Sequence, residues 1–393
     1  EKLQQQSAST GAALNKKFRT EARFDMQFAS LDVFFGGLEK LIGPPRLRDG
    51  DLVPQMQFEH QECKDSYQSF TSSNGLTTTS NAEWEFVYNP KLTVKYAERE
   101  EFKQAHYESN QRQPIPMKRM RELMCEKNAQ LESMSHTPMV EAELISGRLY
   151  TGPMYEKYNG VLRSYSGAEF LVTKFQELCM GNLYTTTIHC INSCIIKLSK
   201  LTIAGTVYRG FSGARLPPEF WNKNAEGVRG GIEYGFSSTT VERGQALHYA
   251  SGKAATVFEM HMGMIDRGAD VSWLSQHPFE KEILFPPLTG LEALDTAVDG
   301  DTLIVNARLS LNLTAMTIEQ VLHRRGKMLQ DLSQGLQSEL QQELLASDVK
   351  PEATKQACAL LGKAMETKLF SEKSLDKFNV DEHFAKSVTQ ALD

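Results

Sequence analysis

Two glutamates, Glu280 and Glu282, stand one residue apart in the stretch HPFEKEILFPP (277–287), where a Pro-Pro pair ends an apolar run. Together, two carboxylates can stabilise a developing positive charge and accept a proton. Residues two apart on an extended strand share a face, so both acids would lie on the same side as Leu284. This stretch therefore predicts a strand that places paired carboxylates at the edge of an apolar core.

A cation is placed in a similar way by the earlier stretch TVYRG (206–210). Arg209 shares a strand face with Val207, so it points inward if Val207 faces the core. A buried guanidinium needs an anion as its partner. Gly210 follows directly and would let that anion approach the backbone.

Hydroxyl side chains follow an aromatic residue in the stretch GFSSTT (235–240). Phe236, Ser238 and Thr240 share one face of a strand, and Ser237 offers a hydroxyl if the register differs by one residue. The face shared with Phe236 favours Ser238. Each polar group alone has an ordinary explanation, such as an ion pair, a strand hydroxyl or a solvated edge. Their occurrence in this order suggests a site.

The ordered set VYRG, F-x-S-T-T and E-K-E, the last running into ILFPP, resembles the arginine-specific mono-ADP-ribosyltransferases. That family is defined by an Arg on one strand, a Ser-Thr-Ser-like triplet after an aromatic residue, and a terminal Glu-x-Glu. The stretch YEKYNGVLR (155–163) is similar to a helix that precedes the first strand in eukaryotic members. The resemblance covers about residues 148–315, and Thr240 stands where many members carry Ser.

The resemblance implies transfer of ADP-ribose, a pentosyl group, from NAD to an arginine side chain with release of nicotinamide. It places Glu282 beside the ribose, where a carboxylate stabilises the positive charge that develops on the sugar. Arg209 would bind the diphosphate or the adjacent ribose, with Gly210 next to it. Ser238 would hold Glu282 through a hydrogen bond, and Phe236 would either lie near the nicotinamide or fill the core.

The second carboxylate, Glu280, is expected to serve the acceptor. A guanidinium with a pKa above about 12 is a poor nucleophile while it is protonated, so Glu280 would orient it and take its proton. Within the family, E-x-E accompanies arginine targets and Q-x-E accompanies others. Two alternatives stay open: an NAD glycohydrolase, and a non-catalytic interaction module on a degenerate transferase scaffold.

The helices and strands that the sequence predicts around these residues indicate an α+β protein. Helices are expected at about 153–165, 168–180, 184–200 and 242–251, and largely antiparallel strands at 206–210, 233–240, 255–262, 281–285, 291–298 and 302–311. The stretch 75–90 is predicted to be β-rich, and leucines from Leu329 to Leu344 form a stripe typical of a packed helical face.

The resemblance implies an ADP-ribosyltransferase-like β-sandwich core with a preceding helical lobe. We predict three segments: an accessory region of unassigned role (1–145), the catalytic domain (146–316) and a helical tail (317–393). No G-x-G-x-x-G follows a predicted strand, so a Rossmann unit would not hold the NAD.

Composition limits the remaining possibilities. The chain has 393 residues, 40% hydrophobic and 23% charged, which is typical of a globular protein with two or three folded units. A net charge of −6 argues against nucleic-acid binding, and no apolar run approaches the about 18 residues of a membrane span. We expect NAD and an arginine-bearing protein as partners, and the oligomeric state is open.

Six cysteines form no C-x-x-C pair, so we expect reduced thiols in an intracellular, cytoplasmic protein without a metal site. Because the first residue is Glu1, we also expect that the chain was cut from a longer protein, so the absence of a targeting segment from this sequence says little.

Overall fold

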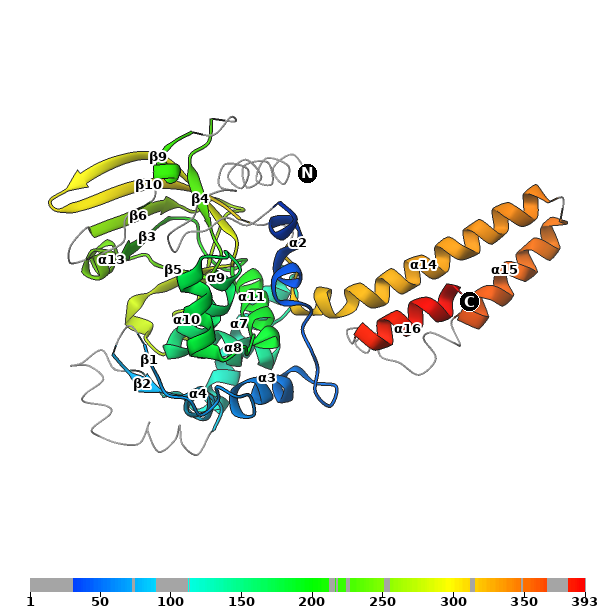
Figure 1. Ribbon diagram of the computed structural model, residues 1–393, viewed down its shortest axis with the longest axis horizontal. Coiled ribbons are helices and arrows are strands. Elements are labelled where there is room, and N and C mark those ends of the chain that lie inside the picture. Colours follow the sequence, from blue (N-terminus) through cyan, green and yellow to red (C-terminus); the bar gives the residue numbers. More distant parts are fainter. Residues whose placement is uncertain are drawn as a thin grey trace. The chain divides into compact units, whose positions relative to one another are not determined.

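The computed structural model describes residues 31–72, 75–89, 112, 114–211, 216, 218–223, 227–250, 255–311, 315–347, 349–365 and 381–392. The chain divides into two compact units, the first comprising Glu1–Gly43 and Val53–Thr317, the second Pro44–Leu52 and Ile318–Asp393. The first combines helices with a large sheet, and the second is mainly helical (Figure 1). Among the described helices, none has both the length and the apolar character that crossing a bilayer requires.

Helices make up most of the first unit ahead of its sheet. They are α2 (Leu31–Ile42), α3 (Leu52–Gln61), α4 (Ser80–Tyr88), α7 (Met117–Ser133), α8 (Glu141–Leu149), α9 (Tyr155–Ser164), α10 (Glu169–Cys179) and α11 (Thr185–Leu198). A π-helical turn, Tyr150–Met154, joins α8 to α9. The helices predicted at 153–165, 168–180 and 184–200 are confirmed as α9, α10 and α11.

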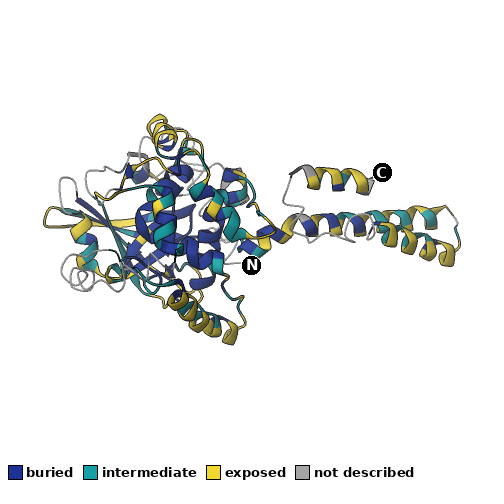
Figure 2. Cartoon of the chain, turned by 90° about the horizontal axis from the view of Figure 1, so that it is seen from below, coloured by how far each residue is buried: buried dark blue, intermediate teal, exposed yellow. Residues whose placement is uncertain are grey.

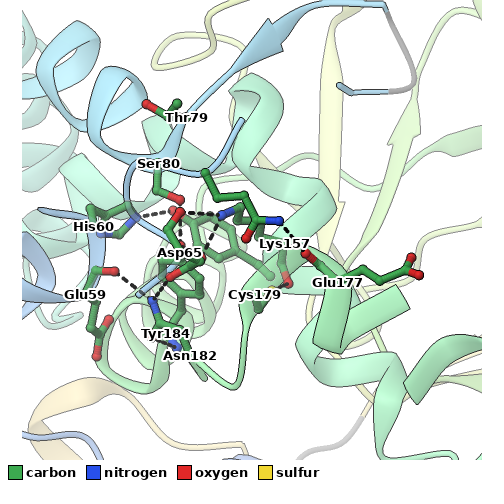
Figure 3. A network of polar contacts seen from close by, with 12 residues as sticks. Glu59, His60, Asp65, Thr79, Ser80, Lys157, Glu177, Cys179, Asn182 and Tyr184 are labelled. Carbon is green, nitrogen blue, oxygen red and sulfur yellow. Dashed lines mark hydrogen bonds and ion pairs between the residues drawn. The ribbon is translucent and has the colours of Figure 1, made fainter. Parts of the chain in front are cut away.

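A buried polar network ties the chain after α3 to these helices (Figure 3). The Asp65 carboxylate pairs with Lys157 Nζ of α9 at 2.6 Å and accepts hydrogen bonds from Tyr184 Oη at 2.5 Å and Asn182 Nδ2 at 2.9 Å. Nearby, Glu59 accepts two backbone N–H groups in the first turn of α11 at 2.9 and 3.0 Å. The described residues from Val53 onward thus pack with the helical lobe as one unit, which continues across residue 145.

The stretch predicted to be β-rich, 75–90, is mostly helical. Strand pairing is limited to the short hairpin of β1 (Phe70–Thr71) and β2 (Thr77–Thr78), and α4 begins at Ser80. The Thr79 side chain accepts a hydrogen bond from the Ala82 N–H at 3.1 Å, an N-cap that starts the helix. The prediction of strand structure here was wrong, because a threonine in a run of β-favouring residues serves as a helix N-cap.

Eight strands form the main sheet in the order β4-β9-β10-β6-β3-β5-β8-β7 (Figure 1). Their bounds are β3 (Thr206–Phe211), β4 (Gly230–Glu233), β5 (Ser237–Thr240), β6 (Ala255–His261), β7 (Ala269–Asp270), β8 (Glu282–Phe285), β9 (Thr289–Asp299) and β10 (Thr302–Ser310). Every pair is antiparallel except β6 with β10, which is parallel. The mixed α+β class and the mainly antiparallel pairing are therefore as predicted.

Both faces of the sheet are covered where the site is built. One face carries the main apolar core, which includes Val207, Phe258 and Phe285. Against the other face lies α13 (Arg243–Ala250), whose Ala246 and Ala250 pack into a smaller buried cluster. The short helix α12 (Pro218–Trp221) contributes Phe220 to the main core. This double packing fixes β3 and β5, the strands that carry the predicted cation and hydroxyls.

The second unit contains α14 (Ile318–Ala346), α15 (Pro351–Met365) and α16 (Asp381–Leu392). Within α14, Leu329 is 1% exposed and the later leucines of the predicted stripe are half-buried. The Ser333 hydroxyl lies 3.3 Å from Met365 Sδ, which joins α14 to α15. Figure 2 shows the long paired helices with one more buried side and one exposed side. The stripe is a packed face, as predicted.

Candidate active site

One cavity of ≈1090 Å³ in the first unit brings the predicted site residues together. Arg209 reaches it from β3, Phe236 and Ser238 from the start of β5, and Glu280 and Glu282 from the segment that leads into β8. Residues more than 70 positions apart in the chain thus surround one space. The spatial convergence that the sequence predicted for these five residues is present.

Glu282 is the buried acid of the cavity. It is the first residue of β8, and only 5% of it is exposed. Burial raises the pKa of its carboxyl to about 7, the Ser238 side chain opposes this rise, and the negative charge of Glu280 adds to it. Ser238 and Glu282 line the same cavity, and the hydrogen bond between them stays a prediction. Near neutral pH this carboxyl exchanges between its neutral and charged forms.

Glu280 does not lie on the strand, contrary to the prediction that both acids share one strand face. It ends a 3₁₀ turn, Pro278–Glu280, and Lys281 adopts a left-handed conformation with φ 46° before β8 begins. Proline favours the first position of such a turn because it lacks an N–H and has a fixed φ. The Thr240 hydroxyl donates to the Glu280 carbonyl oxygen at 2.7 Å, which pins the turn to β5.

A third acid, Glu233 at the end of β4, contacts two arginines that line the cavity. Arg163 Nε and Nη2 of α9 donate to its two carboxylate oxygens at 3.1 and 3.2 Å, and Arg209 Nη2 lies 3.5 Å from it. Arg209 also donates to the Ser237 hydroxyl. The anion that Arg209 requires inside the protein is therefore Glu233. Arg163 and Arg209 thus meet at one carboxylate, and both arginines line the cavity.

Both serines of β5 take part in the site. Ser237 is buried and accepts from Arg209, whereas Ser238 is exposed and lines the cavity together with Glu282. In the β5–β8 ladder Thr240 stands opposite Glu282. The register that placed Ser238 beside the carboxylate is the one found, and the alternative residue, Ser237, serves the cation instead.

Phe236 forms part of the cavity wall and of the core at once. Its ring packs edge-on against Tyr150 with centroids 5.2 Å apart, and it is 1% exposed. Its backbone N–H donates to Asn159 Oδ1 at 2.8 Å, which ties the start of β5 to α9. The aromatic ring is thus held rigidly at the cavity surface.

The structure explains the glycine at position 210 by helix packing, whereas the sequence suggested the approach of an anion. Gly210 is not among the residues that line the cavity. A Cβ on Gly210 would stand 1.8 Å from the Ala246 carbonyl oxygen, so the glycine allows α13 to approach β3. The close approach is therefore made by a helix and not by an anion, and contact of Gly210 with NAD stays a prediction.

Comparison with known proteins identifies the fold. A sequence model described as ADP-ribosyltransferase exoenzyme matches residues 100–312, more than half of the chain. The chain belongs to this family. A search of curated protein sequences finds no match.

Several solved ADP-ribosyltransferases are similar to this chain. HopU1 of Pseudomonas syringae pv. tomato is 17% identical, and the match covers 65% of this chain and 97% of that chain with a TM-score of 0.38. Vis from Vibrio splendidus, in complex with agmatine, is 18% identical over 50% and 86% with a TM-score of 0.34. Exoenzyme S from Pseudomonas aeruginosa, in complex with human 14-3-3 protein beta and bound to carba-NAD, is 23% identical over 44% and 74% with a TM-score of 0.33.

Several cavity residues of this ADP-ribosyltransferase were missed in the sequence. Asn159 and Arg163 are four residues apart on α9 and line the cavity together, a spacing that the stretch YEKYNGVLR already contained. Ser72, Leu76, Phe86 and Arg112 line it from the part of the chain before residue 146. Nothing in their sequence context indicated this, because no motif surrounds them.

Arg112 joins that wall to the segment that leads to Glu280. Its guanidinium makes two hydrogen bonds to the Glu83 carboxylate at 3.0 and 2.6 Å and lies 3.9 Å from the centre of the Phe86 ring. Its Nε donates to Gln276 Oε1 at 2.7 Å. The buried Gln276 also lies against Gly152 of the π-helical turn, where a Cβ would stand 2.3 Å from its amide nitrogen. The turn that carries Glu280 is thus supported from both the lobe and the N-terminal residues.

Proposed function

We propose that this ADP-ribosyltransferase moves ADP-ribose from NAD to arginine side chains of acceptor proteins, with release of nicotinamide. The observation that carries the proposal is the pair Glu280 and Glu282, which line one cavity with Arg209 and Ser238 but occupy different environments. Glu282 is buried at the start of β8, whereas Glu280 lies in a turn at the cavity surface. Two acids in distinct surroundings suit two different tasks.

The donor side of the cavity suits NAD in charge and size. Arg163 and Arg209 both line the cavity, and guanidinium groups are suited to binding a diphosphate. The cavity volume of ≈1090 Å³ lies just above the roughly 300–1,000 Å³ that is typical of small-molecule sites. We expect room for NAD and for the end of an acceptor side chain.

The two carboxylates divide the reaction. As the bond between ribose and nicotinamide breaks, positive charge develops on the sugar, and the ionised Glu282 stabilises it. A guanidinium nitrogen then forms the bond to the same ribose carbon and transfers a proton to Glu280. Nicotinamide leaves with the electron pair of the broken bond, so the products are ADP-ribosyl-arginine, nicotinamide and one proton.

Incubation with NAD and agmatine, followed by mass spectrometry, tests the proposal. We expect an ADP-ribosyl-agmatine adduct with the wild-type chain. Glu280→Gln should lower transfer by about 10²–10⁴-fold, the usual contribution of a general base, and leave NAD hydrolysis in place. Glu282→Gln should lower both activities. Glu122→Gln on the exposed surface of α7 is the matched control and should change neither.

Four results would contradict this assignment. A folded, NAD-binding wild-type chain that forms no adduct would exclude arginine as the acceptor. Free ADP-ribose as the sole product, with and without agmatine, would instead support the NAD glycohydrolase. Equal loss of both activities in Glu280→Gln would show that the two acids do not have separate roles. If the wild type binds NAD without consuming it, the chain is an interaction module.

A further inference from the structure

The Glu280 carboxylate has a specific partner that no sequence motif indicated. Tyr249 lies in the last turn of α13, is 46% exposed and lines the same cavity. Its phenol Oη donates to Glu280 Oε1 at 2.6 Å. The neighbouring cation, Lys281, pairs with Glu242 at 2.5 Å and therefore does not supply this contact. Glu280 Oε2 has no hydrogen-bond partner among the residues that the structure describes.

A second side chain on the same helix lies close to this contact. Gln245 stands one turn before Tyr249 on α13 and lines the same cavity. Burial raises the pKa of the Tyr249 phenol, and Gln245 opposes this rise. An amide N–H₂ that faces a phenol oxygen favours donation of the phenol hydrogen to another acceptor, here the Glu280 carboxylate.

The two ends of this contact are anchored by different elements. On one side, α13 packs tightly onto β3, because Gly210 lets the Ala246 carbonyl approach and Ala250 is fully buried. On the other side, the Glu280 backbone is held by the Thr240 hydroxyl of β5. The helix therefore presents Tyr249 from a rigid support, and the turn presents Glu280 from another. Their side-chain contact joins the carboxylate to both supports.

We infer that Tyr249 is a positioning residue, which orients the Glu280 carboxylate toward the acceptor guanidinium and so sets the ratio of arginine transfer to NAD hydrolysis. The inference rests on the proposed function. With Oε1 held by the phenol, Oε2 remains for the guanidinium, and a fixed acceptor oxygen keeps the attacking nitrogen in line. Water needs no such orientation, so hydrolysis depends on this contact much less.

The same hydrogen bond favours the charged form of Glu280, which a base requires. Burial raises the pKa of the Glu280 carboxyl, and the phenol donor opposes this rise. The other titratable groups around the pair also line the cavity: Glu282 on β8, His277 beside the 3₁₀ turn and His248 on α13. None of these is removed by a change at Tyr249, so a change in the pH profile of that variant reports on the Glu280 contact.

Tyr249→Phe tests the inference, because it removes the hydroxyl and keeps the ring. We expect transfer to agmatine to fall about tenfold, the effect of losing one hydrogen bond to a charged group, while NAD hydrolysis without agmatine stays within about twofold. The acidic limb of the transfer profile should move to higher pH, because the carboxylate loses a donor. Tyr67→Phe, at a phenol that is 70% exposed and outside the cavity lining, is the matched control.

Two outcomes would overturn the positioning role. Transfer at the wild-type rate with an unchanged acidic limb would show that the phenol does not act on Glu280. An equal loss of transfer and hydrolysis, with no movement of either pH profile, would show a purely structural effect. Failure of the proposed function is seen separately, because it appears as absence of the agmatine adduct in the wild type itself. Gln245→Leu should change the same ratio in the same direction by a smaller factor.

Discussion

Glu282→Gln should stabilise the first unit while it removes activity. The carboxyl of Glu282 has a pKa of about 7 in the folded chain, raised from its ordinary value of 4.5 mainly by burial. Between these two values the unfolded chain releases the proton while the folded chain retains it. Wild-type stability therefore falls as pH rises from 4.5 to 7 and is level above that. Glutamine does not titrate, so the variant does not suffer this loss.

The size of the effect follows from the pKa difference. One pKa unit corresponds to about 1.4 kcal/mol, so the variant should gain about 3 kcal/mol in free energy of unfolding at pH 8. At pH 5 the gain shrinks to about 1 kcal/mol, because the wild type loses stability only above the ordinary pKa of 4.5, and pH 5 lies just above that value. A catalytic acid in an unfavourable environment destabilises the fold that holds it.

Urea denaturation followed by tryptophan fluorescence measures this gain. All three tryptophans, Trp84, Trp221 and Trp273, lie in the first unit, so the signal follows the unfolding of that unit. Glu122→Gln, at an exposed acid paired with Arg119, controls for the loss of one surface charge and should stay within about 0.5 kcal/mol at both pH values. A gain for Glu282→Gln that is equal at pH 5 and pH 8 would refute the burial argument.

Three further outcomes are expected. In the wild type, kcat/KM for NAD should rise about tenfold per pH unit below the Glu282 pKa of about 7 and level off above it, which a pH–rate profile checks. Lys157→Ala should lower the free energy of unfolding by about 3–5 kcal/mol, because it leaves a buried acid without its ion-pair partner. Lys174→Ala, at an exposed pair, should lower it by less than about 1 kcal/mol in the same fluorescence assay. Gly210→Ala should lower the free energy of unfolding by about 1–3 kcal/mol and lower activity, because the added methyl group would displace α13 at Ala246. An unchanged urea midpoint and an unchanged reaction rate would show that α13 moves without cost.

Much of the fold was readable from local pattern. Helices α9 to α11 and most strands of the main sheet lie within a few residues of their predicted positions. Each of these segments has apolar residues at the spacing of either a helix or a strand, and turn residues separate one segment from the next. The 75–90 stretch failed for an equally local reason, since threonine serves both strands and helix caps. The expected strand at 233–240 is divided into the end of β4 and all of β5 by Tyr234, Gly235 and Phe236.

The candidate site likewise has residues that the sequence identified and residues that it did not. Arg209, Ser238 and the two glutamates could be named in advance because their order along the chain is itself a pattern, and the structure lines one cavity with them. The partner of Arg209 could not be named, because Glu233 lies on another strand. Arg112 was hidden for a similar reason, since it contacts Gln276 across 164 positions of sequence.

The sequence by itself determined which side chains carry charge and hydroxyls and, through strand and helix periods, the faces on which most of them lie. Only the tertiary structure decided what each of them meets: that Glu282 is buried, that Glu280 sits in a turn held by Tyr249, and that Gly210 makes room for a helix. The physical reason is that periodicity is a property of neighbouring residues, whereas burial, hydrogen-bond partners and the resulting pKa values arise from segments that the chain brings together only by folding.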